Sequence, residues 1–79
     1  MKSKDYFSTS DLGYSAALIS LGYEVTSLDR NSSKKVLFIF KNGDEISEIE
    51  SMYFSGKLKV SARNMVDNIK MLKNRIYNN

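Results

Sequence analysis

Positive charge is concentrated at the C-terminal end of this 79-residue chain, which has twelve Lys and Arg, nine Asp and Glu and a formal charge of +3. Residues 56–79 hold six basic side chains and one acidic one, so this third carries +5 and the remainder −2. A local excess of Lys and Arg is typical of surfaces that bind phosphate groups. The sequence therefore indicates contact with a polyanion, with nucleic acid as the first candidate.

The basic residues fall on one predicted helix and on the segment that leads into it. Ser61 is a helix N-cap residue, and the apolar period after it predicts a helix to about residue 77. Its predicted apolar face consists of Ala62, Met65, Val66, Ile69, Leu72 and Ile76. Residues seven apart lie within about 40° on a helix, so a basic line should border this face. The predicted nucleic-acid-binding residues are Lys57, Lys59, Arg63, Asn64, Lys70, Lys73 and Tyr77.

A solvated basic face is the competing interpretation of the same residues. Lys and Arg near a helix C-terminus interact favourably with the helix dipole and keep a small domain soluble. Asp67 can also pair with Arg63 and Lys70 at helical spacing, which would neutralise part of the charge. A helix-turn-helix is a poor match, because residues 56–61 exceed the usual three- or four-residue connection.

The composition removes most familiar catalytic chemistries. The chain has no His and no Cys, and therefore no imidazole base, no thiol nucleophile and none of the usual zinc ligands. The sequence also has no nucleotide-binding or hydrolase motif. We therefore expect a protein that is not an enzyme and takes no cofactor. The acidic cluster of residues 44–50 is interpreted as the favourable first turn of a helix, with a cation site as the alternative.

The first predicted helix begins at a capping box. Ser8 is its N-cap residue, Asp11 reaches back from the third helical position, and Phe7 and Leu12 occupy the positions of a hydrophobic staple. Gly22 ends the helix as a left-handed cap. Residues 1–7 are then predicted to form a flexible N-terminus.

A β-hairpin is predicted next. Residues 23–26 alternate apolar and polar side chains, as a half-buried strand does. Residues 36–40 are apolar on both faces and rich in strand-forming residues. The polar residues 29–33 form the turn that joins the two strands.

A second helix and a short link complete the chain before the basic helix. Residues 44–55 predict a helix that is capped by Asp44 or Gly43 and ended by Gly56. Residues 57–60 alternate apolar and basic side chains, which fits either a short extended link or a third strand.

The order helix, hairpin, helix, helix (α-β-β-α-α) predicts a small α+β domain over residues 1–79, with the helices packed on an antiparallel sheet. A two-stranded sheet is barely stable alone, so helices must cover one of its faces. Because residues 36–40 are apolar on both faces, the second face needs either more helices or a second subunit.

Nine aromatic residues are present, and most fall at core positions of the predicted elements. Aromatic side chains that stay exposed beside one face of the strand would mark a protein interface. The predicted interface residues, which a homodimer would use, are Phe38, Phe40, Tyr53 and Phe54.

Membrane and export signals are absent from the sequence. The longest apolar run, residues 36–40, is far shorter than the ~20 residues of a spanning helix. The start of the chain has no apolar stretch of the kind that a signal peptide needs. We therefore expect a cytoplasmic protein that does not contact a membrane.

Residues 4–12, Lys-Asp-Tyr-Phe-Ser-Thr-Ser-Asp-Leu, resemble a family of short proteins of unknown function from phages, bacteria and mobile elements. Nearly the whole chain takes part in the resemblance, through residues 16–22, 27–29, 38–40, 55–60 and 72–77. The family has no catalytic or binding residues to carry over. The resemblance implies an accessory protein of phage or mobile-element type that acts by binding.

Three hypotheses of function follow. The first is a non-enzymatic binding module that contacts nucleic acid through the basic C-terminal helix. The second is a protein-interaction or inhibitor module, for example against a host defence system, that acts as a homodimer. The third is a binder of a charged nucleotide through Lys and Tyr side chains.

Overall fold

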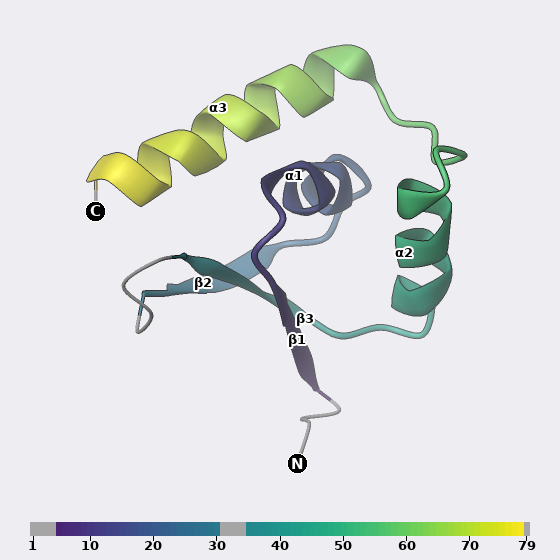
Figure 1. The fold of residues 1–79 in the computed structure, drawn as a ribbon, viewed down its shortest axis with the longest axis horizontal. Coiled ribbons are helices and arrows are strands. Elements are labelled where there is room, and N and C mark those ends of the chain that lie inside the picture. Colours follow the sequence, from purple (N-terminus) through teal and green to yellow (C-terminus); the bar gives the residue numbers. More distant parts are fainter. Residues whose placement is uncertain (1–4, 31–34, 79) are drawn as a thin grey trace.

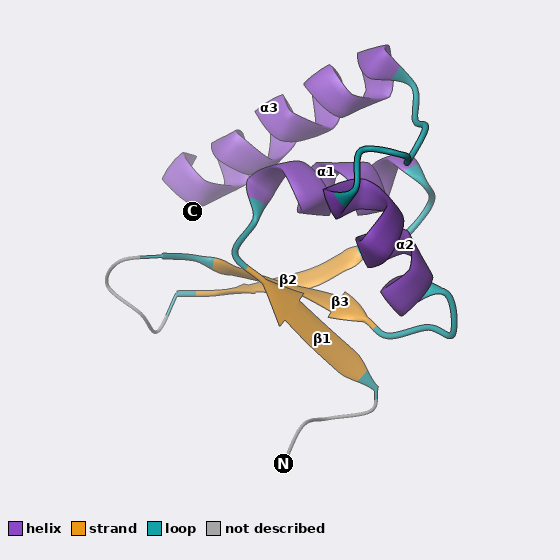
Figure 2. Ribbon diagram, turned by 45° about the vertical axis from the view of Figure 1, so that its right-hand side comes forward, coloured by secondary structure: helices purple, strands orange, loops and turns teal. Residues whose placement is uncertain are grey.

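Three helices lie on one side of a three-stranded antiparallel sheet (Figure 1; Figure 2). The computed structural model describes residues 5–30 and 35–78. The elements in chain order are β1 (Tyr6–Thr9), α1 (Leu12–Ser20), β2 (Val25–Asp29), β3 (Leu37–Lys41), α2 (Ile46–Phe54) and α3 (Ala62–Asn78). The predicted α+β class and the order helix, hairpin, helix, helix are confirmed.

Strand β1 is the element that the sequence prediction missed. Its residues pair antiparallel with β3, so that Phe7 lies opposite Phe40. Ser8 is therefore inside a strand and does not cap a helix, and the predicted flexible N-terminus is wrong for Tyr6 and Phe7, while residues 1–4 lie outside the described part. Tyr, Phe and Thr favour strands, but the strand that pairs with them comes thirty residues later in the chain.

Helix α1 is capped by Asp11 at its start and is followed by a glycine. The Oδ1 atom of Asp11 accepts a hydrogen bond from the backbone N–H of Tyr14 at 2.7 Å, which caps the helix. At the other end Gly22 has a φ of 105°, and the N–H of Tyr23 donates to the carbonyl of Leu18 at 3.0 Å. This bond is the long-range half of a Schellman motif, so the predicted left-handed stop is confirmed.

Strands β2 and β3 form the predicted hairpin, with Leu28 opposite Phe38. Strand β2 begins two residues later than predicted, and its register shifts between Val25 and Ser27. Such a shift marks a bulge, which bends an edge strand. The predicted turn at residues 29–33 lies largely outside the described residues.

Helix α2 has a different start from the predicted one. Glu45 occupies the N-cap position without a side-chain hydrogen bond, so the predicted cap at Gly43 or Asp44 is wrong. The physical reason is that Asp44 and Glu45 form a turn ahead of the helix. Gly56, with a φ of 79°, ends α2 as predicted. Residues 57–60 form an irregular link and not a strand.

The core lies between the sheet and α1. Phe38 and Phe40 are exposed to 1% and 0%, and they pack against the buried helix residues Leu18 and Leu72. The prediction of Phe38 and Phe40 as interface residues is therefore wrong, because alternate residues of a strand point to one face and the helices cover that face. The half-buried Leu37 and Ile39 point to the other side, which the described helices leave open (Figure 2).

Candidate nucleic-acid interface

Helix α3 packs on α1 through the face that contains Leu72. Leu72 is fully buried, and the Nδ2 atom of Asn68 donates to Oγ of Ser20 at 2.9 Å. The predicted apolar face is wrong at Ala62 and Val66, which are exposed. Because Asn68 and not Val66 faces α1, the helix is rotated relative to the prediction.

This rotation turns the basic line outward. Arg63 and Leu72 are nine residues apart, which places them about 180° apart on the helix. Arg63 and Lys70 are exposed, and Tyr77 is 79% exposed. These three side chains extend over about 21 Å of helix at 1.5 Å per residue. The line therefore opposes the buried face, whereas the sequence predicted that it would border it.

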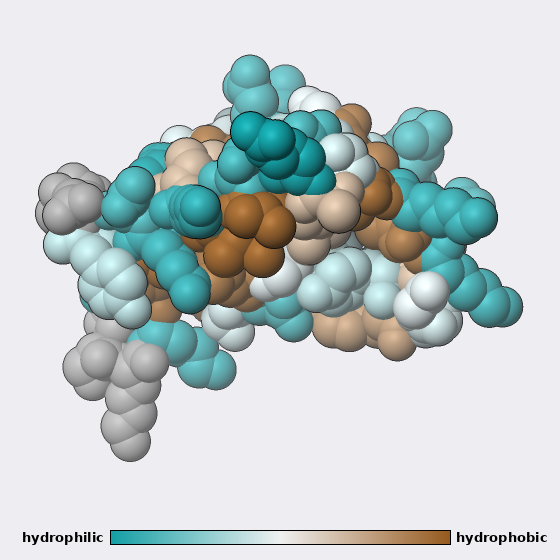
Figure 3. Space-filling view, turned by 90° about the horizontal axis from the view of Figure 1, so that it is seen from above, coloured by the Kyte–Doolittle hydropathy of each residue, from teal (hydrophilic) through white to brown (hydrophobic). Residues whose placement is uncertain are grey.

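The other predicted residues are also at the surface but are less aligned. Lys73 is exposed beside the line, and Lys57 and Lys59 are exposed on the link that enters α3. Asn64 lies about 100° from Arg63 on the helix, and its backbone N–H donates to Oγ of Ser61 at 3.2 Å, which confirms the predicted cap. Figure 3, which looks down on this side of the molecule, shows hydrophilic side chains interspersed with several hydrophobic areas.

An ion pair on α3 neutralises part of this charge. Nε of Arg63 lies 3.6 Å from Oδ2 of Asp67, and the two side chains are 86% and 60% exposed. An exposed pair of this kind stabilises a helix by about 0.3–0.5 kcal/mol. A phosphate group could therefore displace the carboxylate from Arg63 with little loss of stability.

Arg30 joins the basic surface from a distant part of the chain. Its Nη1 atom donates to the carbonyl of Ile76 at 3.0 Å, and its Nη2 atom donates to the carbonyl of Arg75 at 2.6 Å. Carbonyls in the last turn of a helix have no partner within the helix, so this guanidinium caps α3. The sequence prediction missed Arg30 because nothing near it in the chain signals a helix end more than forty residues away.

The remaining predicted interface residues lie in an aromatic cluster. Phe54 is 59% exposed, whereas Tyr53 is half-buried between Phe54 and Tyr14, with ring centroids 4.8 and 5.4 Å away. A Cβ atom at Gly13 would overlap the hydroxyl of Tyr53, so a larger residue there would force the Tyr53 side chain to shift. Burial, together with the nearby Asp11 carboxylate, raises the pKa of Tyr53.

Tyr14 forms the buried centre of this cluster. Its side chain is 2% exposed, and no group among the described residues forms a hydrogen bond with its hydroxyl. Burial, with smaller contributions from Glu50 and Tyr23, raises the pKa of Tyr14 to about 12. The hydroxyl therefore stays protonated at neutral pH, which fits a packing role.

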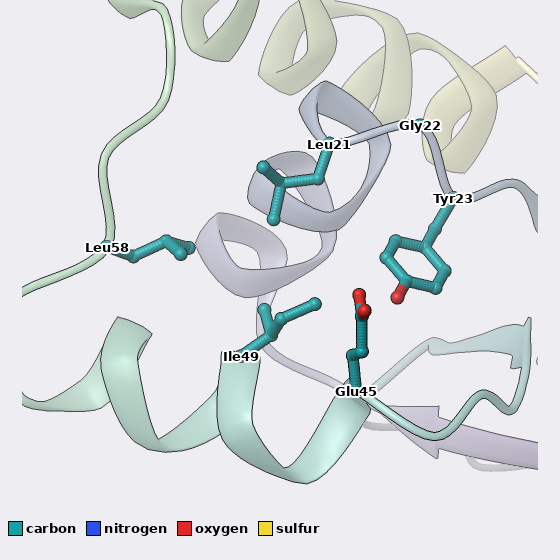
Figure 4. A pocket seen from close by; sticks show the side chains of 6 residues that line it. All are labelled: Leu21, Gly22, Tyr23, Glu45, Ile49 and Leu58. Carbon is teal, nitrogen blue, oxygen red and sulfur yellow. The ribbon is translucent and has the colours of Figure 1, made fainter.

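A hollow of about 380 Å³ lies between α1 and α2 (Figure 4). Leu21, Ile49 and Leu58 point into it from three segments of the chain, and the carboxylate of Glu45 lies beside the ring of Tyr23 at its other end. Glu45 would repel the phosphates of a nucleotide, so this hollow lends no support to a nucleotide-binding function.

The described residues offer neither a metal site nor a membrane-spanning helix. Residues 5–30 and 35–78 contain no group of three or more acidic side chains that could hold a metal ion. Within the same residues, no helix combines the length and the apolar character that are needed to cross a bilayer.

The fold and the surface together define a small α+β protein with an outward-facing cationic helix. The chain belongs to the family described as "Domain of unknown function (DUF5659)", whose model matches residues 4–78. This match confirms the resemblance to a family of unknown function. No curated protein matches the chain, and no solved structure does either.

Proposed function

We propose that this protein binds nucleic acid through the outward face of α3 and catalyses no reaction. The observation that carries the proposal is the cationic line that begins with Arg63 and Lys70, which lies on the exposed side of α3, opposite the buried Leu72. Arg30 places a further cation at the C-terminal end of the same helix.

The side chains on this face favour contacts with the sugar–phosphate backbone over base reading. Lys and Arg side chains neutralise phosphates, and such contacts position a protein without selecting a sequence. The exposed ring of Tyr77 can stack on an unpaired base, which every base permits. We therefore expect binding that is strongly dependent on salt and weakly dependent on sequence.

The strength of the salt dependence gives a quantitative expectation. Six phosphate contacts, the number of basic residues after Gly56, would give a slope of about −5 in log affinity against log salt for duplex DNA. The pairing of Arg63 with Asp67 reduces the available charge, so the measured slope should be shallower than this bound.

Fluorescence anisotropy with a labelled DNA duplex and a labelled RNA single strand, at two salt concentrations, tests the proposal. Lys70→Glu should weaken binding several-fold and make the salt slope shallower by about 1, because one phosphate contact is lost. Lys41→Glu makes the same change of charge on the sheet and should leave the slope unchanged. No binding at low salt, or equal effects of the two variants, would overturn the proposal.

A further inference from the structure

Strand β1 forms one edge of the sheet. The strand order is β1-β3-β2, so no described strand lies on the outer side of β1. Figure 2 shows β1 at the side of the sheet, below the helices. An unpaired edge presents backbone donors and acceptors to any extended segment that approaches it.

The register identifies which backbone groups of β1 point outward. The N–H of Asn42 donates to the carbonyl of Asp5 at 2.7 Å, so this facing pair is hydrogen-bonded. Hydrogen-bonded and non-hydrogen-bonded pairs alternate along an antiparallel ladder. Phe7 therefore forms the next hydrogen-bonded pair, whereas Tyr6 and Ser8 direct their N–H and carbonyl groups away from β3.

The opposite edge of the sheet is less suited to pairing. Strand β2 has a register shift between Val25 and Ser27, and the Oγ1 atom of Thr26 donates to the carbonyl of Ile39 at 3.0 Å. Bulges of this kind disfavour the addition of a strand. Strand β1 has a continuous register and no Pro or charged residue between residues 6 and 9.

We propose that β1 pairs with β1 of a second copy of this chain, antiparallel about a two-fold axis at Phe7. Tyr6 then lies opposite Ser8 of the partner subunit, and Ser8 lies opposite the partner's Tyr6. In both pairs the outward N–H of one residue meets the outward carbonyl of the other. The edge is thus self-complementary, as a two-fold interface requires, and the two three-stranded sheets join into one.

The side chains of β1 fit this arrangement. Phe7 is half-buried and stacks on Phe40 with ring centroids 5.4 Å apart. Phe7 and the partner's Phe7 would be neighbours on the helix side of the joined sheet. Next to this edge lies a hollow of about 440 Å³, lined in part by Phe7, Ser8 and Glu50, which leaves room for side chains of the added strand. The ring of Tyr6, 46% exposed, would cover the partner's Ser8 on the open face.

The size of the edge sets the expected strength. Stable dimers usually bury about 800 Å² on each partner, and a four-residue edge with two aromatic rings buries less. We therefore expect a weak dimer whose population depends on the protein concentration. Helix α1 separates β1 from α3 in both ribbon views, so both cationic faces stay exposed in the dimer (Figure 1; Figure 2).

Sedimentation velocity of the full chain over a wide concentration range tests the pairing. The weight-average sedimentation coefficient should rise from the value of the monomer towards that of the dimer as the concentration increases. Amide hydrogen exchange supplies a readout at single residues: the amides of Tyr6 and Ser8 should exchange several-fold more slowly at high concentration. The amide of Thr26, on the other edge, should not change.

Two double variants, both at positions 6 and 8, distinguish pairing through β1 from dimerisation through any other surface. Tyr6→Glu with Ser8→Glu places like charges opposite each other across the two-fold axis and should keep the protein monomeric. Tyr6→Lys with Ser8→Glu places opposite charges there and should restore the dimer. A wild-type chain that stays monomeric with concentration-independent exchange, or a Glu/Glu variant that dimerises like the wild type, would overturn the proposal.

Discussion

At the residue scale, Tyr14 combines near-complete burial with a hydroxyl that has no partner among the described residues. An unpaired buried polar group lowers stability by about 1–3 kcal/mol relative to a satisfied one. The surrounding aromatic rings pack against Tyr14 but form no hydrogen bond with it. The ring of Tyr14 therefore stabilises the folded state, whereas its unpaired hydroxyl group destabilises it.

Removal of this oxygen should stabilise the protein and change its response to alkali. In the unfolded chain Tyr14 ionises near its ordinary pKa of 10.0, whereas in the folded chain its pKa is about 12. The folded state therefore holds this proton more tightly, and stability is lost as the pH rises from about 10 to about 12, by about 3 kcal/mol when complete.

Urea unfolding of the wild type and of Tyr14→Phe, at neutral pH and between these two values, measures both effects. Tyr14→Phe should raise the free energy of unfolding by about 1 kcal/mol at neutral pH and remove the alkaline loss that this residue causes. Tyr77→Phe, at a 79% exposed position, is the matched control and should alter neither. A Tyr14→Phe variant with the same alkaline loss as the wild type would contradict the assignment.

At the scale of elements, local signals in the sequence predicted one helix start and two helix ends correctly, whereas the caps predicted at Ser8 and at Gly43 or Asp44 were wrong. Ser61 caps α3 and Gly22 ends α1, as their residue types indicated. Strand β1 was missed because its stability depends on pairing with β3, and no local pattern reports a partner so far along the chain. The prediction of Phe38 and Phe40 as interface residues failed for a similar reason, because periodicity does not say which face of a strand the helices cover.

The rotation of α3 is the element-scale error that matters most for function. The spacing of the apolar residues predicted that Val66 faces α1. In the structure the polar Asn68 faces α1 instead, and its side chain donates a hydrogen bond to Ser20. A half-buried polar side chain with a partner in another helix leaves no trace in an apolar period. The predicted basic residues were nevertheless the right ones for an outward surface, because charge keeps them in water whichever way the helix turns.

This assignment predicts that two substitutions on α3 have effects opposite to those that the apolar pattern implies. Asn68→Ala should lower the free energy of unfolding by about 1 kcal/mol, because the contact with α1 is lost. Val66→Ala, at a half-exposed position, should change it by less than about 0.5 kcal/mol. Chemical unfolding of both variants measures the difference, and a larger loss for Val66→Ala would show that the sequence-based orientation of α3 was right.

At the scale of the whole molecule, Arg30 connects the hairpin to the far end of the cationic helix. Its guanidinium donates hydrogen bonds to the carbonyls of Arg75 and Ile76. Arg30 belongs to the part of the chain with a net negative charge, and the fold places its positive charge beside the basic C-terminal third. The basic surface is thus assembled by the fold and not by the C-terminal third alone.

Two substitutions of Arg30 should separate its charge from its geometry. Arg30→Lys keeps the charge but loses the planar fork that reaches two carbonyls, so amide exchange in the last turn of α3 should speed up while affinity for DNA is retained. Arg30→Gln also removes the charge, so DNA binding should weaken about twofold to fivefold, with a shallower salt slope. Amide exchange and anisotropy titrations at two salt concentrations measure both quantities. If Arg30→Gln left both unchanged, Arg30 would have no part in either the helix end or the surface.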